Sequence, residues 1–176
     1  NRIREHVTMN TGTARGGGET RIGDDGLFMA GCHIAHDAQI GDRVIVVNSS
    51  AVAGHCIIDD DCSIVWLSVV MQWVCSGQGS FICAVSIVTK DVVPHGLVQG
   101  PRGVLDGLNL VGLKRKGVAR ADITALRAAF QMLKDGEGTF QDRAHRLADE
   151  SDSAYVQQMV AFILGDTDRN FLTPGS

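Results

Sequence analysis

The chain has 176 residues, of which 44% are hydrophobic and 20% are charged. This balance excludes an intrinsically disordered chain, and the net charge of −4 argues against general nucleic-acid binding, which requires a broad basic surface. The apolar runs are too short for an integral membrane segment. The chain begins at Asn1, already inside patterned sequence, so we expect a longer parent that extends further at the N-terminus.

A bulky apolar residue recurs at every sixth position through the first half of the chain, with Ser76 as the exception. The series runs Ile22, Phe28, Ile34, Ile40, Val46, Val52, Ile58, Ile64, Val70, Ser76, Ile82 and Val88. Neither the 3.6-residue period of a helix nor the two-residue period of an ordinary strand explains this spacing. Three hexads instead form one triangular coil with an aliphatic side chain inside each face, and successive coils stack about 4.8 Å apart. The sequence therefore predicts a left-handed parallel β-helix of hexapeptide repeats over residues 1–93.

A second period of eighteen residues, one full coil, shows which positions face outward. The column two places after the inward position is wholly polar in one set of hexads: Asp24, Asp42, Asp60 and Gln78. The same phase puts His36, Gly54 and Gln72 in an outer ladder whose neighbours lie roughly 5 Å apart. His55 follows Gly54, and His33 lies on the coil of His36. Residues that are dispersed in the sequence therefore converge on one outer patch.

The six-residue period ends near residue 93. The next segment, 94–118, is rich in glycine and has no period, so we expect a connecting loop there. We expect residues 119–176 to form a small C-terminal α-helical domain that covers the open end of the β-helix.

Helical spacing of apolar residues predicts three helices in this C-terminal domain. The first begins at Arg120 and ends before Gly136, and the others cover Thr139–Glu150 and Ser153–Leu164. The terminal residues 168–176 are expected to be an exposed tail.

Five cysteines are spread over the repeat region: Cys32, Cys56, Cys62, Cys75 and Cys83. They show neither the C-x-x-C spacing of a zinc knuckle nor the density of a disulfide scaffold. We interpret them as small buried thiols in a reducing compartment, which predicts a cytoplasmic protein.

Three motifs carry a resemblance to a known family: HIAHD at 33–37, AGH at 53–55 and NLVGLKRKG at 109–117. With them the chain resembles the bacterial acyl-(acyl-carrier-protein)–UDP-N-acetylglucosamine O-acyltransferases. The resemblance implies transfer of an acyl chain, expected to be a 3-hydroxyacyl chain, from acyl carrier protein to the 3-hydroxyl of UDP-N-acetylglucosamine, the first step of lipid A biosynthesis. It also implies a homotrimer with active sites between neighbouring subunits, without a metal or other cofactor. A 3-amino sugar as acceptor stays open.

The resemblance also implies roles for individual residues. His36 corresponds to the general base, Asp37 to the group that orients its ring, and the backbone N–H of Gly54 to the oxyanion donor. Further residues correspond to substrate-binding positions: His33, His55 and Gln72 around the sugar and acyl groups, and Asn109, Arg115 and Lys116 on the nucleotide side. In an acidic protein, the basic run GLKRKGVAR at 112–120 would suit both nucleotide phosphates and an acidic carrier protein.

The chain departs from the family pattern at several positions. Met71 stands where the family usually has a substrate-binding histidine, and Val65–Trp66 replaces a common Gly-Gly pair. Trp66 and Ala84 correspond to the groove for the acyl chain, where an indole would favour shorter chains. Ser76 interrupts the inward stack, and a buried hydroxyl without a partner would be unfavourable there.

Two other functions are compatible with the residues. His33, His36 and His55 could hold zinc between subunits, as in hexapeptide-repeat enzymes of the γ-carbonic anhydrase type. A diverged, inactive β-helix scaffold is the second alternative. The glycines of ARGGGE at 14–19 lack the strand and helix that flank a phosphate-binding loop, so we expect a surface loop there.

Overall fold

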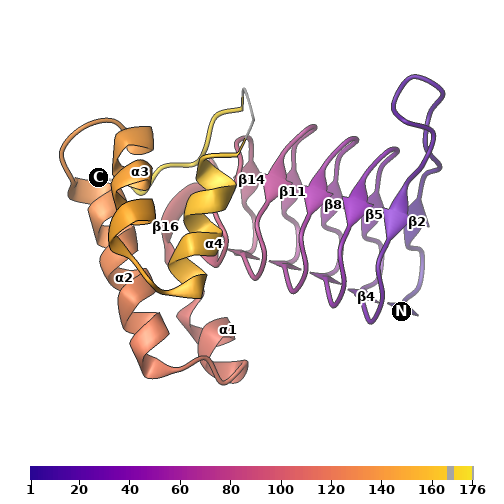
Figure 1. The fold of residues 1–176 in the computed structure, drawn as a ribbon. Coiled ribbons are helices and arrows are strands. Elements are labelled where there is room, and N and C mark those ends of the chain that lie inside the picture. The colour runs from indigo at the N-terminus through magenta and orange to yellow at the C-terminus, as the bar shows by residue number, and fades with distance from the viewer. Residues whose placement is uncertain (166–168, 176) are drawn as a thin grey trace.

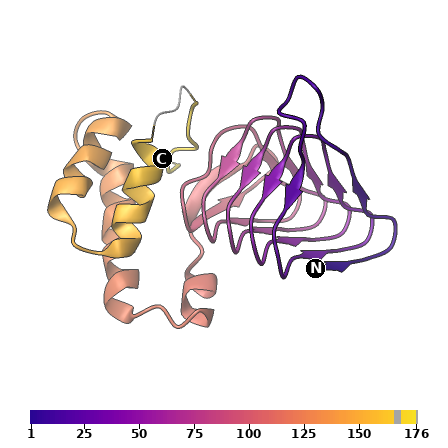
Figure 2. The same cartoon turned by 45° about the vertical axis from the view of Figure 1, so that its right-hand side comes forward.

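The computed structural model describes residues 1–165 and 169–175. Its first part is a stack of triangular coils, with a helical domain at the end opposite the N-terminus (Figures 1 and 2). The left-handed parallel β-helix of hexapeptide repeats is confirmed. Among the described residues, no helix is long and apolar enough to span a membrane.

Each coil contributes one short strand to each of three sheets, here named A, B and C. Sheet A contains β1 (Arg2–Ile3), β4 (Leu27–Phe28), β7 (Ile45–Val46), β10 (Ser63–Ile64), β13 (Phe81–Ile82), β15 (Gly96–Gln99) and β16 (Val104–Leu108). Sheet B contains β2 (Thr8–Met9), β5 (His33–Ile34), β8 (Ala51–Val52), β11 (Val69–Val70) and β14 (Ile87–Val88). Sheet C contains β3 (Arg21–Ile22), β6 (Gln39–Ile40), β9 (Ile57–Ile58) and β12 (Cys75–Ser76).

The turns between these strands share one backbone conformation. The third residue after each inward position from Ile22 to Ile82 has a positive φ: Asp25, Gly31, Asp37, Arg43, Ser49, His55, Asp61, Leu67, Trp73, Gly79 and Val85. These turns form three edges, the A–B, B–C and C–A corners, named after the sheets that they join. Because each corner turns the chain sharply, the residues beside it project outward, and they stack on their equivalents in the next coil.

The inward positions form the core of the β-helix. Phe28, Ile34, Val46, Val52 and Ile64 are fully buried. Ser76 is also fully buried, so its predicted inward position is confirmed.

The buried Ser76 hydroxyl has a partner, so the unfavourable case of an unpaired hydroxyl does not arise. Its Oγ lies 2.7 Å from that of Ser80, which in turn donates to Sγ of Cys62 at 3.2 Å. A pair of small polar residues therefore replaces one aliphatic side chain.

The expectation of a connecting loop over 94–118 was wrong. The segment contains β15, β16 and helix α1 (Leu110–Arg115), and β15 and β16 form an antiparallel pair at the end of sheet A. The six-residue period ends there because the last coil leaves the edge of sheet A unpaired. The hairpin pairs with that edge through its backbone, which does not require the hexad pattern.

The three predicted helices are confirmed as α2 (Arg120–Asp135), α3 (Phe140–Glu150) and α4 (Ala154–Ile163). They bury Leu126, Leu133, Leu147, Met159 and Ile163 against one another.

The expected exposed tail was also wrong for its described part, 169–175. Phe171 and Leu172 are buried, and backbone hydrogen bonds join Asp91 to Asn170 and Leu172. Two apolar residues in a short segment carry no periodic signal, so the sequence did not predict that the segment packs against the last coil. Asp168 and Ser176 lie outside the described residues.

Candidate functional site

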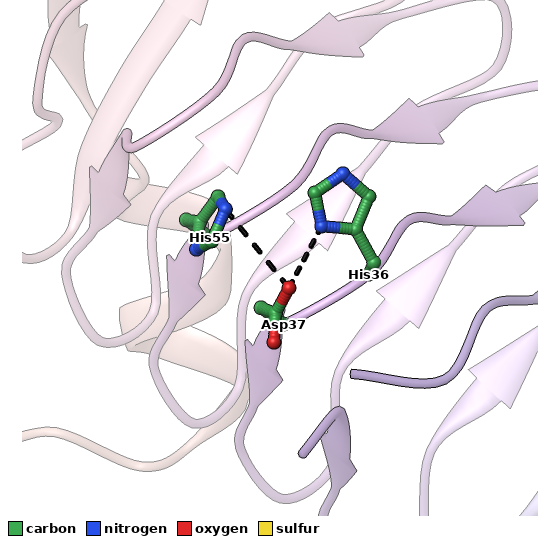
Figure 3. A group of neighbouring side chains, drawn as sticks. All are labelled: His36, Asp37 and His55. Atoms are coloured by element: carbon green, nitrogen blue, oxygen red, sulfur yellow. Dashed lines mark hydrogen bonds and ion pairs between the residues drawn. The ribbon is translucent and has the colours of Figure 1, made fainter. Parts of the chain in front are cut away.

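The B–C corner brings together His36, Asp37 and His55 (Figure 3). His36 and Asp37 follow β5, and His55 follows β8 one coil later. His36 Nδ1 lies 2.8 Å from Asp37 Oδ2, and His55 Nε2 lies 4.0 Å from the same oxygen. The side chain of His36 is 40% exposed, whereas that of Asp37 is 1% exposed. The corner thus presents a solvent-accessible imidazole backed by a buried carboxylate.

Hydrogen bonds keep Asp37 ionised. Its Oδ1 accepts from the N–H of Thr13 at 2.9 Å, and its Oδ2 accepts from the Thr13 hydroxyl at 2.7 Å. Burial alone would raise the pKa of Asp37, but hydrogen bonds from His36 and Thr13 outweigh that effect and lower the pKa to about 2. A carboxylate fixed in this way can hold the proton of His36 on Nδ1, which leaves Nε2 free to act as a base.

Gly54 provides the space in which the His36 ring lies. A Cβ atom on Gly54 would come within 2.8 Å of Cε1 and 3.0 Å of Nε2 of His36. Any larger residue would therefore displace the imidazole. Among the described residues, the N–H of Gly54 donates to no protein group, so it is available to a developing oxyanion.

The second imidazole, His55, is held by an aromatic neighbour. Its ring stacks on that of Trp73 with centroids 3.9 Å apart and an interplanar angle of 3°. The rings of His36 and His55 meet edge to face at 5.1 Å. Gln72, beside Trp73, is exposed on the same corner, so the predicted ladder of His36, Gly54 and Gln72 is present.

His33 lies apart from this group. It is on β5 rather than at the corner, and its Nδ1 lies 2.7 Å from Oγ1 of Thr8. The group with metal-binding potential is instead His36, Asp37 and His55, whose ligand atoms lie within 4.8 Å of one another. The contact between His36 and Asp37 has hydrogen-bond length, shorter than the roughly 3.3 Å between two tetrahedral zinc ligands. The geometry favours a base with its orienting carboxylate over the alternative of a zinc site made of His33, His36 and His55.

The three residues that the resemblance places on the nucleotide side meet at a separate pocket of about 320 Å³. It lies at the C–A corner, between sheet A and helix α1, and Asn109, Arg115 and Lys116 all line it. Asn109 caps α1 by accepting from the N–H of Gly112 at 2.9 Å, and its amide donates to the carbonyl of Gly79 at 3.0 Å. Asn109 thus attaches helix α1 to the β-helix, and the pocket lies between these two elements.

Lys116 forms an ion pair at the edge of this pocket, where its ammonium lies 2.7 Å from Asp61 Oδ2. Arg43 binds the same carboxylate. Burial would raise the pKa of Asp61, but hydrogen bonds from Arg43 and Lys116 outweigh it and lower the pKa to about 2. Arg115 is exposed at the pocket and remains the cation best placed for a phosphate.

Trp66 and Ala84 lie at the A–B corner, not beside His36. They stack on adjacent coils, where the N–H of Val85 donates to the carbonyl of Trp66. The indole is 51% exposed, so its outward position is confirmed. Within one chain, the A–B corner with Trp66, the histidine corner and the pocket at the C–A corner therefore face three directions.

Sequence reasoning missed two residues of the histidine corner. Trp73 follows His55 by eighteen residues, so the coil repeat could have revealed it. Thr13 lies in a loop outside the repeat and carries no positional signal in the sequence.

Comparison with known proteins identifies the family. The family model described as UDP-N-acetylglucosamine O-acyltransferase, domain 2, matches residues 91–172. A Paracoccus denitrificans protein named acyl-(acyl-carrier-protein)–UDP-N-acetylglucosamine O-acyltransferase is 59% identical over 99% of this chain, and a Caulobacter vibrioides protein of the same name is 46% identical. The chain spans 66% of the length of each.

The solved structures agree with this assignment. UDP-N-acetylglucosamine acyltransferase from Campylobacter jejuni is 35% identical, with a TM-score of 0.90 over 99% of this chain and 68% of its own. UDP-N-acetylglucosamine acyltransferase from Bacteroides fragilis is 30% identical, with a TM-score of 0.89 over 96% of this chain and 66% of its own. The chain therefore belongs to the UDP-N-acetylglucosamine O-acyltransferase family.

Proposed function

We propose that this chain transfers a 3-hydroxyacyl group from acyl carrier protein to the 3-hydroxyl of UDP-N-acetylglucosamine, the first step of lipid A biosynthesis, in the cytoplasm. The names of its relatives support both substrates. The observation that carries the proposal is the accessible His36 imidazole bonded at 2.8 Å to buried Asp37.

The proposed step needs one base and one oxyanion donor. His36 Nε2 removes the proton of the sugar hydroxyl as its oxygen attacks the thioester carbonyl. The N–H of Gly54 stabilises the oxyanion of the tetrahedral intermediate. Collapse of this intermediate forms the ester and breaks the C–S bond, and the departing thiolate takes the proton from His36. Asp37 holds the ring throughout and stays ionised.

The two halves of the site support a homotrimer. His36 lies at the B–C corner and the nucleotide pocket at the C–A corner, so we propose that one subunit supplies the base and its neighbour the pocket. Exposed apolar side chains, which are unusual on a monomer's surface, support such packing. They include Ile45, Ile57, Trp66, Leu67, Met71, Trp73 and Ile87.

Cations near α1 support docking of an acidic carrier protein. Lys114, Arg115 and Arg120 are exposed, and Lys114, Arg120 and Arg127 line a shallow groove at the start of α2. We propose that this surface attracts the carrier protein by charge complementarity.

Substitution of the base tests the proposal. His36→Ala should lower kcat at least about 10²-fold, while binding of UDP-N-acetylglucosamine, followed by calorimetry, stays unchanged. Asp37→Asn should have a smaller effect. His145→Ala, at an exposed position on α3, is the matched control and should retain full activity. Transfer by a folded His36→Ala protein at the normal rate would remove His36 from the mechanism.

A further inference from the structure

A loop interrupts the hexad repeat close to the histidine corner. Residues 11–19 connect β2 to β3 and project from the N-terminal end of the β-helix (Figure 1). The loop is nevertheless anchored to the corner by Thr13. The carbonyl of Thr13 accepts from the N–H groups of Gly16 and Gly18, both at 3.0 Å, so the loop turns tightly around this residue.

Thr13 contacts both oxygens of Asp37 at once. Its N–H donates to Oδ1 at 2.9 Å, and its hydroxyl donates to Oδ2 at 2.7 Å. The N–H of Asp37 donates in turn to Oγ1 of Thr20 at 2.7 Å, at the end of the same loop. Two donors on different oxygens prevent rotation of the carboxylate about its Cβ–Cγ bond.

The rest of the loop closes over the same group. A Cβ atom on Gly16 would come within 2.2 Å of Asp37 Oδ2 and 2.6 Å of His55 Cε1. The backbone at Gly16 therefore lies directly against both side chains, and this contact accounts for the near-complete burial of Asp37.

We infer that Thr13 is a positioning residue for the proposed reaction. By fixing Asp37, it directs Oδ2 at Nδ1 of His36 and selects the tautomer with a free Nε2. The inference rests on the proposed function for its kinetic consequence, but the tautomer of His36 can be measured without any turnover.

The kinetic experiment compares two substitutions at one position. Thr13→Val keeps the shape and the backbone N–H but removes the hydroxyl donor, so we expect kcat to fall about tenfold with KM for UDP-N-acetylglucosamine unchanged. Thr13→Ser restores the donor and should restore most of kcat. Thr11→Val, at an exposed threonine of the same loop, is the control and should behave as wild type. An unchanged kcat in Thr13→Val, or a loss that Thr13→Ser does not recover, would overturn the inference.

A spectroscopic experiment separates this inference from the proposed function. In protein labelled with ¹⁵N-histidine, wild-type His36 should show a protonated Nδ1 at a pH where the ring is neutral, and Thr13→Val should show a mixture of tautomers. The signal is assigned from its loss in His36→Ala. If the tautomer changes but no transfer occurs even in wild type, the proposed function fails and the positioning role stands. An unchanged tautomer contradicts the positioning role.

A second variant tests whether the loop must pack against Asp37 to fix the tautomer of His36. Gly16→Ala should push the loop off Asp37 and reproduce the mixed tautomers, whereas Gly107→Ala, where an added Cβ meets nothing within 4 Å, should not. A wild-type histidine spectrum for Gly16→Ala would count against the loop as the source of the effect.

Discussion

At the scale of single residues, the buried carboxylate of Asp37 and the partly buried carboxylate of Asp61 depend on their hydrogen-bond donors. Asp37 is held by Thr13 and His36, and Asp61 by Arg43 and Lys116. Both anchor chain segments to a corner of the β-helix, so their ionisation is linked to the stability of the fold.

This linkage predicts a loss of stability in acid. The pKa of each carboxyl is lowered from 3.8 to about 2 in the folded chain, so the unfolded chain binds protons first. The stabilising contribution is complete above about pH 4 and is lost as the pH falls towards 2. Denaturant unfolding followed between pH 5 and pH 2 should show a shallower decline for Asp37→Asn and Asp61→Asn than for wild type. Asp106→Asn, at an exposed aspartate, should keep the wild-type slope. Equal slopes in all four proteins would contradict the assignment.

Trp66 gives a prediction about substrate choice. If its exposed indole narrows the acyl groove, each methylene excluded costs about 0.8 kcal/mol of burial, so the protein should prefer shorter acyl chains. Trp66→Gly should shift kcat/KM towards longer chains across a series of donors that differ by two carbons. Trp73→Phe keeps an aromatic ring beside His55 and controls for the loss of a tryptophan. The same preferred length in wild type and Trp66→Gly would exclude the indole from the groove.

Sequence reasoning reached some residues of the site and not others. His36, Gly54 and Gln72 were predictable as a ladder because the coil repeat is regular. The ion pair between Lys116 and Asp61 was not predictable. It joins the end of helix α1 to the C–A corner, and the sequence between the two residues leaves the six-residue period. Thr13 was not predictable either, because it lies in a loop outside the repeat.

At the scale of elements, the corners are the strained part of the β-helix. Positive φ is unfavourable for residues with a Cβ atom, most of all for β-branched ones. Val85 has a φ of 59°, and 53% of its surface is exposed. Burial of its side chain therefore offsets little of the strain in this backbone conformation.

Replacement of Val85 should therefore stabilise the fold. Val85→Asn is expected to raise the free energy of unfolding by about 0.5–1 kcal/mol, because asparagine tolerates the left-handed region. The matched control is Val104→Asn on β16, an exposed valine outside the corners, which should be neutral or destabilising. Denaturant titration measures both. A lower stability for Val85→Asn would show that strain at this corner is not the dominant effect.

The elements that sequence reasoning placed correctly are those with a strong period. The hexad repeat predicts the coils, and the helical spacing from Arg120 predicts α2, which ends as expected before Gly136. The hairpin of β15 and β16 escaped prediction because it follows from the free edge of the last coil, not from local pattern.

At the scale of the whole molecule, the separation of the two proposed halves of the site has the largest consequence. One chain presents the proposed base at the B–C corner and the proposed nucleotide pocket at the C–A corner. A site made from both halves requires that neighbouring subunits face each other with different surfaces, as in a cyclic trimer.

Subunit complementation tests this claim most directly. His36→Ala removes the base, and Arg115→Glu places a negative charge at the pocket for the diphosphate; each protein alone should be nearly inactive. Trimers refolded from an equal mixture should regain about a quarter of wild-type activity, because some sites then combine an intact base with an intact neighbouring pocket. A mixture of His36→Ala with Asp37→Asn, both in the same half, is the control and should show no more activity than the mean of the two proteins measured alone. If mixed trimers form, as native mass spectrometry can show, and His36→Ala with Arg115→Glu stays inactive, the site does not lie between subunits.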